Sequence, residues 1–250
     1  MSRLARVVVA DYPYHVTHRG NRCDDVFFAA EDRHRYRMWL AENAAKFHLD
    51  VWAYSLMTNH VHLLVVPRRK DSLARGIGRA HLRYASWINW RQGWSGHLWA
   101  NRFYSAPLDD AHLWAAVKYV ENNPVRAGVV QRAADYDWSS ARAHALGQPD
   151  PLLSSPRPFP DPARLGDWSA WLAEQADEEI LARLRTNTCT GRPCGSEGFV
   201  ALFEKSLGRV LAVREMRGQL PHFLARRSDR EEEATLARNE VTVPSFQEQS

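Results

Sequence analysis

Two short motifs hold the side chains of this sequence that could carry out chemistry. His60 and His62 are one residue apart in an apolar run, and a strand would point both imidazoles to the same face. Two imidazoles on one strand face can bind a divalent transition metal. Tyr119 and Asn123 are four residues apart, so on one helix the phenol and the amide would address a common point. The spacing predicts a metal site and a candidate nucleophile.

Each motif also has an ordinary structural interpretation. The chain contains 11 histidines, so a single His-x-His pair can arise by chance. A tyrosine on a helix more often packs in a core than attacks a substrate. Asn123 could simply be the last residue of a helix, because Pro124 disfavours helical geometry at the residue before it. Taken singly, neither motif decides between catalysis and structure.

Hydrophobic periodicity predicts the elements that must position these residues. Alternating patterns predict strands over residues 14–19, 49–56 and 60–66, and a short strand within residues 96–108. Helical periodicity predicts helices over residues 31–47, 72–91 and 109–123, with Ser72 as a helix N-cap. The order β-α-β-β-α-β-α predicts an α+β fold, in which helices pack on one ferredoxin-like antiparallel sheet.

The chain beyond this pattern has a different composition. Residues 1–146 form the predicted first domain, and residues 147–167 form a proline-rich linker, with six prolines between positions 147 and 162. Amphipathic patterns over residues 168–184 and 198–213 predict a small helical C-terminal region, residues 168–227, that could bind DNA. Residues 228–250 are acidic and are predicted to be a disordered tail.

The composition is that of an ordinary soluble protein, with 250 residues of which 45% are hydrophobic and 25% charged. No apolar run approaches the length of a membrane span, and the N-terminal apolar run is too short for a signal peptide. Three cysteines provide neither a disulfide framework nor zinc-type spacing, so Cys189 and Cys194 are expected to be ordinary buried or loop thiols. We expect a cytoplasmic protein.

The charge distribution indicates a polyanionic partner. Residues 1–147 carry 20 Lys and Arg against 13 Asp and Glu, a net charge of +7, whereas residues 229–250 carry 2 against 6, a net charge of −4. Basic residues interleaved with aromatic ones are typical of single-stranded DNA binding, although any one of them could be a solvated surface charge. The candidate DNA contacts are Arg19, Arg22, Arg68, Arg69, Lys70, Arg79, Arg83 and Arg102.

Five segments in one order carry a family resemblance. They are YHVTHRGN (14–21), AYSLMTNHVHLLVVP (53–67), GHLWANRFYS (96–105), KYVENNPVRAGVV (118–130) and DYDWSSARAH (135–144). Together they closely resemble the REP-associated tyrosine transposases, single-tyrosine members of the HUH endonuclease superfamily. The resemblance covers nearly all of residues 5–145. It continues more weakly through NTCTGRPCGSEGFV (187–200), where Cys189 and Cys194 stand at positions at which members often have Arg and Leu.

The resemblance implies roles for individual residues. His60 and His62 would be metal ligands, Asn123 would be the third ligand, and Tyr119 would be the nucleophile in an HUH-fold catalytic domain over residues 1–146. The ion would be Mg²⁺ or Mn²⁺, because mixed nitrogen and oxygen ligation admits either.

The implied activity is that of a single-stranded DNA endonuclease and strand transferase. It would act at palindromic hairpin repeat elements through a 5′-phosphotyrosine intermediate, in the cytosol and associated with the nucleoid. The alternative is a non-catalytic hairpin-binding protein derived from a transposase. Either protein would bind single-stranded or hairpin DNA and would not associate with a membrane. Either could be a monomer or a homodimer.

Overall fold

Four strands form one antiparallel sheet in the computed structural model, which describes residues 6, 8–155, 159 and 167–211. The strand order is β2-β3-β1-β4, and every neighbouring pair is antiparallel. The strands are β1 (Tyr14–Arg19), β2 (Leu49–Leu56), β3 (His60–Pro67) and β4 (Tyr104–Pro107). With one helix between β1 and β2 and another between β3 and β4, this is the predicted ferredoxin-like arrangement.

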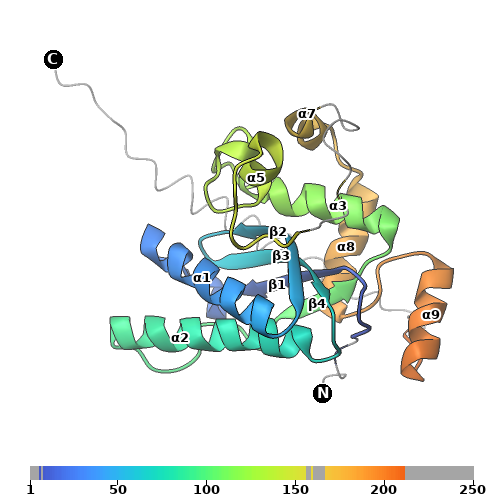
Figure 1. Cartoon of the computed structure of the whole chain (residues 1–250), viewed down its shortest axis with the longest axis horizontal. Helices are drawn as coiled ribbons and strands as arrows, with labels where there is room; N and C mark the ends of the chain where they lie inside the picture. Colours follow the sequence, from blue (N-terminus) through green and yellow to red (C-terminus); the bar gives the residue numbers. More distant parts are fainter. Residues whose placement is uncertain (1–5, 7, 156–158, 160–166, 212–250) are drawn as a thin grey trace.

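Helices cover both faces of the sheet (Figure 1). One face packs against α1 (Ala30–Lys46) and α2 (Gly78–Gln92), and the other packs against α3 (Asp110–Glu121) and α8 (Glu178–Thr190). The remaining elements are η1 (Asn21–Cys23), η2 (Leu73–Ile77), α4 (Asn123–Arg126), η3 (Ala133–Asp135), α5 (Ala141–Leu146), α7 (Trp168–Ala173) and α9 (Glu197–Leu207). Across the ranges that the structure describes, no helix is long and apolar enough to cross a membrane.

The alternation of side chains along each strand creates two separate cores. Tyr14 and Val16 of β1 join the core under α1 and α2, whereas the intervening His15 points to the side of α3 and contacts Tyr119. Leu64 of β3 belongs to the second core, with residues of α3 and α8. Burial of such a side chain contributes about 1.5–3 kcal/mol, so both faces of the sheet stabilise the fold.

Three helix boundaries differ from the sequence prediction. Ser72 is not an N-cap: its backbone is helical, its hydroxyl accepts the N–H of Arg69 at 3.0 Å, and η2 precedes α2. Tyr119 and Asn123 do not lie on one helix, because α3 ends at Glu121 and α4 begins at Asn123. Pro124 is tolerated in the first turn of α4, where its missing N–H has no helical partner.

The C-terminal helices also differ from the prediction. The helix predicted over residues 168–184 is divided into α7 and α8, because Asp177 accepts the N–H groups of Glu179 and Ile180 and starts a new helix. The helix predicted over residues 198–213 is α9, which ends before Gly208 at φ 62°. The predicted tail 228–250 and most of the linker after residue 155 lie outside the described residues.

The described residues between α5 and residue 155 pack against β2. The hydroxyl of Tyr54 donates to Asp150 at 2.6 Å, and Arg37 forms an ion pair with the same carboxylate at 3.0 Å. Ser154 N–H donates to the carbonyl of Val51 at 2.8 Å. The hydroxyl of Ser154 also accepts the N–H of Val51 at 2.9 Å, so Ser154 satisfies both backbone groups of this residue of β2, an edge strand of the sheet.

A chain of buried polar side chains links β1 to both helices beneath it. The carbonyl of Asn101 accepts from His18 Nε2 at 3.3 Å, so His18 Nδ1 is the acceptor for His81 Nδ1 at 2.7 Å. The remaining nitrogen of His81 accepts the hydroxyl of Tyr36 at 2.7 Å. Trp99 stacks on both imidazoles, with ring centroids 4.7 Å apart. This chain fixes the loop before β4 to the end of β1.

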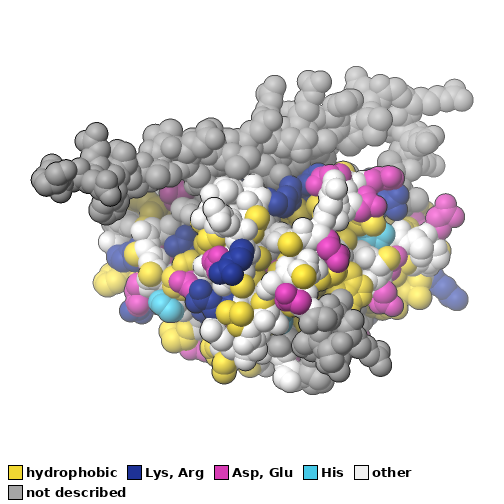
Figure 2. All heavy atoms as spheres, turned by 90° about the horizontal axis from the view of Figure 1, so that it is seen from above, with side chains coloured by type: hydrophobic (Ala, Val, Ile, Leu, Met, Phe, Trp, Pro, Cys, Tyr) yellow, Lys and Arg dark blue, Asp and Glu magenta, His cyan; other side chains and the backbone are white. Residues whose placement is uncertain are grey.

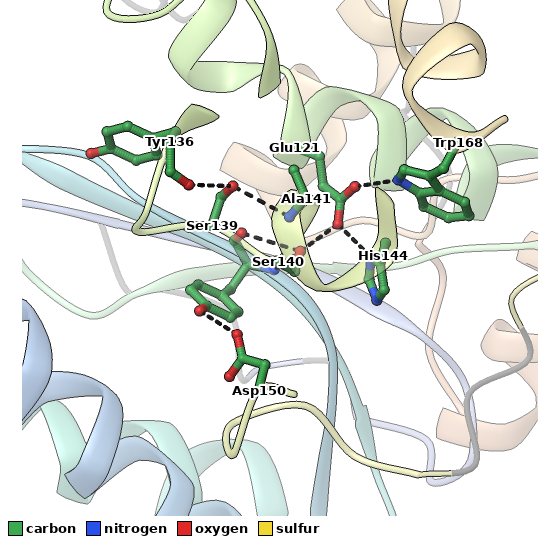
Figure 3. Close-up of polar contacts among 9 residues, drawn as sticks. Glu121, Tyr136, Ser139, Ser140, Ala141, His144, Asp150 and Trp168 are labelled. Carbon is green, nitrogen blue, oxygen red and sulfur yellow. Dashed lines mark hydrogen bonds and ion pairs between the residues drawn. The ribbon is translucent and has the colours of Figure 1, made fainter. Parts of the chain in front are cut away.

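Glu121 holds the C-terminal end of α3 against α5 and α7 (Figure 3). Its carboxylate is fully buried and accepts from Ser140 Oγ at 2.5 Å, His144 Nδ1 at 2.6 Å and Trp168 Nε1 at 2.7 Å. A buried carboxylate is costly unless it is paired and hydrogen-bonded, and here three donors surround it. The cluster thereby fixes the end of the helix that also carries Tyr119.

The buried histidines predict acid sensitivity. Burial lowers the pKa of His18 from 6.5 to about 4 and that of His81 well below its usual value. Between these pKa values the unfolded chain binds more protons than the folded chain does. The contribution of the two histidines to the free energy of unfolding is therefore fully present above pH 6.5 and decreases as the pH falls toward 4. We expect the free energy of unfolding in urea to decrease by at least about 2 kcal/mol between pH 7.5 and pH 5. An equal free energy of unfolding at both pH values would contradict this prediction. The control is His34→Gln, at an exposed position, which should show the same decrease as the wild type.

The Glu121 cluster predicts an asymmetry between two glutamates. Glu121→Ala leaves three buried donors without their acceptor and should destabilise the protein by about 3 kcal/mol. Glu42→Ala removes only a surface ion pair with Arg83, 2.7 Å long, and should cost less than about 1 kcal/mol. Chemical denaturation of both variants measures the difference, and similar losses would mean that the buried cluster contributes no special stability.

Candidate active site

The register between β1 and β3 defines the site. Thr17 lies opposite His62 and Arg19 lies opposite His60, on the sheet face that α3 covers. The His60 and His62 rings are perpendicular, with centroids 5.0 Å apart. Tyr119 reaches His62 from α3 at a centroid distance of 5.3 Å.

Asn123 completes the group, since its side chain forms a hydrogen bond with His60. The structure therefore brings together all four residues that the sequence singled out, although Tyr119 and Asn123 come from two helices.

These four residues are buried. His60 and His62 are each 6% exposed, Tyr119 is 3% exposed and Asn123 is 8% exposed. Burial lowers the pKa of His60 to about 3, with a further contribution from the charge of Arg19. Burial likewise keeps the pKa of His62 well below 6.5, with smaller effects of neighbouring positive groups. Both imidazoles are thus neutral at pH 7, which is the form that binds a metal.

Hydrogen bonds decide which nitrogen each ring has free. Asn59 Nδ2 donates to the carbonyl of Cys23 at 3.3 Å, which leaves Asn59 Oδ1 to accept from His60 Nδ1 at 2.6 Å. The lone pair of His60 is then on Nε2. On the neighbouring ring, His62 Nδ1 lies 3.0 Å from His15 Nε2.

The donor set fits a divalent cation of intermediate hardness. Two neutral imidazoles and the amide of Asn123 supply nitrogen and oxygen ligands of the kind that Mn²⁺ accepts and Mg²⁺ tolerates. Within the described ranges, no group of three or more His, Cys, Asp or Glu side chains could hold a metal ion. An ion at this place would therefore depend on the amide as well as on the two imidazoles.

Arg126 is a site residue that the sequence analysis missed. Its guanidinium lies over the Tyr119 ring, with Cζ 4.8 Å from the centroid, and its charge contributes to the lowered pKa of His62. It belongs to the segment KYVENNPVRAGVV, so the motif contained the signal. The sequence analysis predicted one helix that ends at Asn123, which would place Arg126 beyond the site. In the structure, α4 brings the Arg126 guanidinium over the Tyr119 ring.

A cavity of about 510 Å³ lies beside Tyr119. Its walls come from α3, α4, α7, the beginning of α8 and the segment around η3. Lys118, Arg126 and Arg132 are among the lining residues, and Lys118 also contacts Glu174 at 3.3 Å. The tyrosine thus has the histidines on one side and a partly basic cavity on the other.

Three predicted DNA contacts lie at the His60 end of the sheet. Arg19 ends β1, and Arg22 follows in η1, whose neighbour Gly20 donates its N–H to the carbonyl of Asn59 at 2.8 Å. Arg102 is exposed and precedes β4, which pairs with β1 up to Thr17. Of these three, Arg19 is close enough to His60 and His62 for its charge to lower their pKa values, whereas Arg102 lies beside Arg6.

The other five predicted contacts lie elsewhere. Arg68, which is paired with Asp11 and Asp50, is followed by Arg69 and Lys70 beyond the end of β3 remote from His60. Arg79 and Arg83 are on α2, on the opposite face of the sheet. The structure does not bring these five residues to the candidate site.

Figure 2 shows the described residues of the surface on the side of α5 and α7 as a mixture of charges. Lys and Arg side chains stand among Asp and Glu side chains and hydrophobic groups on this face.

Comparison with known proteins finds similarity over the part of the chain that contains this group of residues. Residues 8–123 match the family described as Transposase IS200 like. The REP-associated tyrosine transposase bound to a REP hairpin is similar at 17% identity and a TM-score of 0.48, over 64% of this chain and 96% of its own. A transposase candidate from Deinococcus radiodurans R1 is similar at 21% identity and a TM-score of 0.35, over 48% of this chain and 97% of its own. No curated protein matches this chain.

The matched segment includes the four-stranded sheet and all four residues of the buried group. Over residues 8–123, slightly less than half of its length, the chain is similar to the IS200-like transposases.

Proposed function

We propose that the protein is a metal-dependent single-stranded DNA endonuclease and strand transferase that acts at hairpin elements through Tyr119. The observation that carries this proposal is the contact of Tyr119 with His62, at a centroid distance of 5.3 Å, in a segment of the IS200-like transposase family. A structural tyrosine could occupy any buried position. Here it adjoins two neutral imidazoles, an amide and a guanidinium.

The tyrosine would attack the phosphorus of one phosphodiester. A bond forms between the phenol oxygen and phosphorus, and the bond from phosphorus to the 3′ oxygen breaks. The phenol loses its proton and the departing 3′ oxygen gains one, which leaves a 5′-phosphotyrosine and a free 3′-hydroxyl. A tyrosine in water ionises near pH 10, so the positive charge of Arg126 over the ring would favour the phenolate.

The intermediate explains why joining needs no energy source. The phosphotyrosine retains a phosphodiester bond, so the 3′-hydroxyl of a second strand can displace Tyr119 and restore a DNA linkage. His60, His62 and Asn123 would hold Mg²⁺ or Mn²⁺, which when bound polarises the phosphate and stabilises the charge that develops on it. Arg19, opposite His60, adds a fixed positive charge at the same place.

The proposed substrate follows from the motifs and from the local chemistry. The resemblance of the sequence motifs to REP-associated tyrosine transposases favours hairpin DNA with a single-stranded segment. Exposed Arg102 and half-exposed Trp94 lie between α2 and β4, where charge can pair with phosphates and a ring can stack on an unpaired base. The cavity beside Tyr119 offers room for part of the strand.

The nucleophile is tested by covalent adduct formation. Tyr119→Phe removes one hydroxyl and should abolish the protein–DNA adduct formed with labelled single-stranded hairpin DNA and Mn²⁺, while hairpin binding survives. Tyr104→Phe, on β4, is the matched control and should retain the adduct. Denaturing gel electrophoresis measures the adduct and a mobility-shift assay measures binding.

The outcomes separate the alternatives. An undiminished adduct in Tyr119→Phe would place the nucleophile elsewhere. A wild-type protein that binds the hairpin without forming an adduct would instead be the non-catalytic relative. The fully complementary duplex should remain uncut, because a stacked helix resists bending its backbone into a buried site.

The metal ligands are tested separately. His60→Ala or His62→Ala should lower the cleavage rate at least about a hundredfold, because each removes a ligand of the ion that stabilises the phosphate charge. A chelator should reproduce the loss in the wild type, and added Mn²⁺ should reverse it. His34→Ala, at an exposed position, is the control. Full cleavage by chelator-treated wild type would show that the two histidines are structural.

A further inference from the structure

We propose that Thr188 of α8 and His15 of β1 are positioning residues that fix the tautomer of His62 and so prepare it to bind the metal. This inference rests on the proposed metal-dependent function. It also assigns a part in the active site to a helix that lies outside the family match over residues 8–123.

A continuous hydrogen-bond chain runs from α8 to the metal-binding strand. Thr188 Oγ1 lies 2.7 Å from the carbonyl of Leu184 and 2.8 Å from His15 Nδ1. His15 Nε2 lies 3.0 Å from His62 Nδ1, and the two imidazole planes are within 4° of parallel. Thr188 and His15 are each 1% exposed, so water does not compete for these contacts.

The direction of the chain follows from its first acceptor. A carbonyl can only accept, so the single hydroxyl proton of Thr188 goes to Leu184 and the hydroxyl oxygen accepts from His15 Nδ1. An imidazole buried between a hydroxyl and a second imidazole has no charged partner to stabilise a positive charge, so His15 carries one proton, on Nδ1. Its Nε2 therefore accepts from His62 Nδ1. The proton of His62 is thereby held on Nδ1, and the lone pair is left on Nε2.

This direction is the one that a metal ligand requires. An imidazole binds a metal through its unprotonated nitrogen, and the hydrogen bond at the other nitrogen sets which one that is. Asn59 has the equivalent effect on His60 through a contact at 2.6 Å. The two predicted ligands therefore have the same tautomer, one set by the adjacent residue and one by a helix 126 positions further along the chain.

The position of Thr188 is fixed by the segment that follows it. Gly191 ends α8 with φ 72°, and the chain then turns to β4, where Cys194 N–H donates to the carbonyl of Pro107 at 2.8 Å. The carbonyl of Cys194 accepts from Asp109 at 3.1 Å, next to the start of α3. Asn187 Nδ2 closes the turn by donating to Pro193 at 2.8 Å. The segment of residues 187–200, which resembles the family only weakly, thus holds the Thr188 hydroxyl against His15 of β1.

The test compares three variants of the full chain. Thr188→Val keeps the shape of the side chain and removes its hydroxyl, whereas Thr188→Ser keeps the hydroxyl. Thr190→Val is the matched control: Thr190 is on the same helix and makes the same bond to the carbonyl four residues earlier, 2.9 Å long, without touching His15. Thermal unfolding identifies any variant that fails to fold.

The first readout is the tautomer of His62 in the metal-free protein. Long-range ¹H–¹⁵N spectra of the imidazoles distinguish a protonated Nδ1 from a protonated Nε2, and the spectrum of His62→Gln assigns the signals. Wild type, Thr188→Ser and Thr190→Val should have His62 protonated on Nδ1. In Thr188→Val, His15 is released from its partner, and His62 should become a mixture of both tautomers.

The second readout is the affinity for Mn²⁺ alone, measured by electron paramagnetic resonance of the free ion. Thr188→Val should bind Mn²⁺ about 10- to 100-fold more weakly than wild type, and Thr188→Ser and Thr190→Val should bind it as wild type does. Equal affinity and an unchanged His62 tautomer in a folded Thr188→Val protein would overturn the inference. A wild-type protein that binds no Mn²⁺ would instead overturn the proposed function.

Discussion

The register of β1 against β3 is the constraint on which the rest of the site depends. In this register Arg19 lies opposite His60 and Thr17 opposite His62, while His15 reaches the His62 ring on the same face. If β1 slipped by one residue against β3, the side chain of His15 would point into the apolar core under α1 and α2. The side chain of Tyr14 would then point to the face that carries the site. The hydrophobic alternation that folds the sheet is therefore also what aligns its histidines.

Burial then imposes a requirement on each polar group of that face. A buried donor or acceptor without a partner costs about 1–3 kcal/mol, so the imidazoles are stable in the second core only if other groups bond to them. Asn59 meets this need for His60, and His15 with Thr188 meets it for His62. The same bonds that satisfy the buried imidazoles determine which nitrogen of each ring remains available, so stability and the proposed metal binding depend on one network.

Local patterns sufficed to predict the strands, the antiparallel sheet and the meeting of His60 with His62, because side-chain period and residue spacing depend only on neighbours in the chain. The break between Tyr119 and Asn123 was not predictable in this way, since Pro124 is compatible both with the end of a helix and with the first turn of another. The bond between His15 and Thr188 joins residues 173 positions apart and leaves no periodic signal. The family resemblance identified the residues of the site, but folding alone determines which of their atoms face one another.

The C-terminal helices meet this site at three separate places. Trp168 donates to Glu121, Leu172 accepts from Asn122 at 2.6 Å, and Thr188 contacts His15. The first two contacts flank the break between the helices that carry Tyr119 and Asn123, so they set the orientation of Tyr119 and Asn123 relative to each other. The third acts on the histidines from the opposite side. Because residues of the first 146 positions form the site and residues after position 167 fix its geometry, neither part of the chain is expected to hold the four side chains in place without the other.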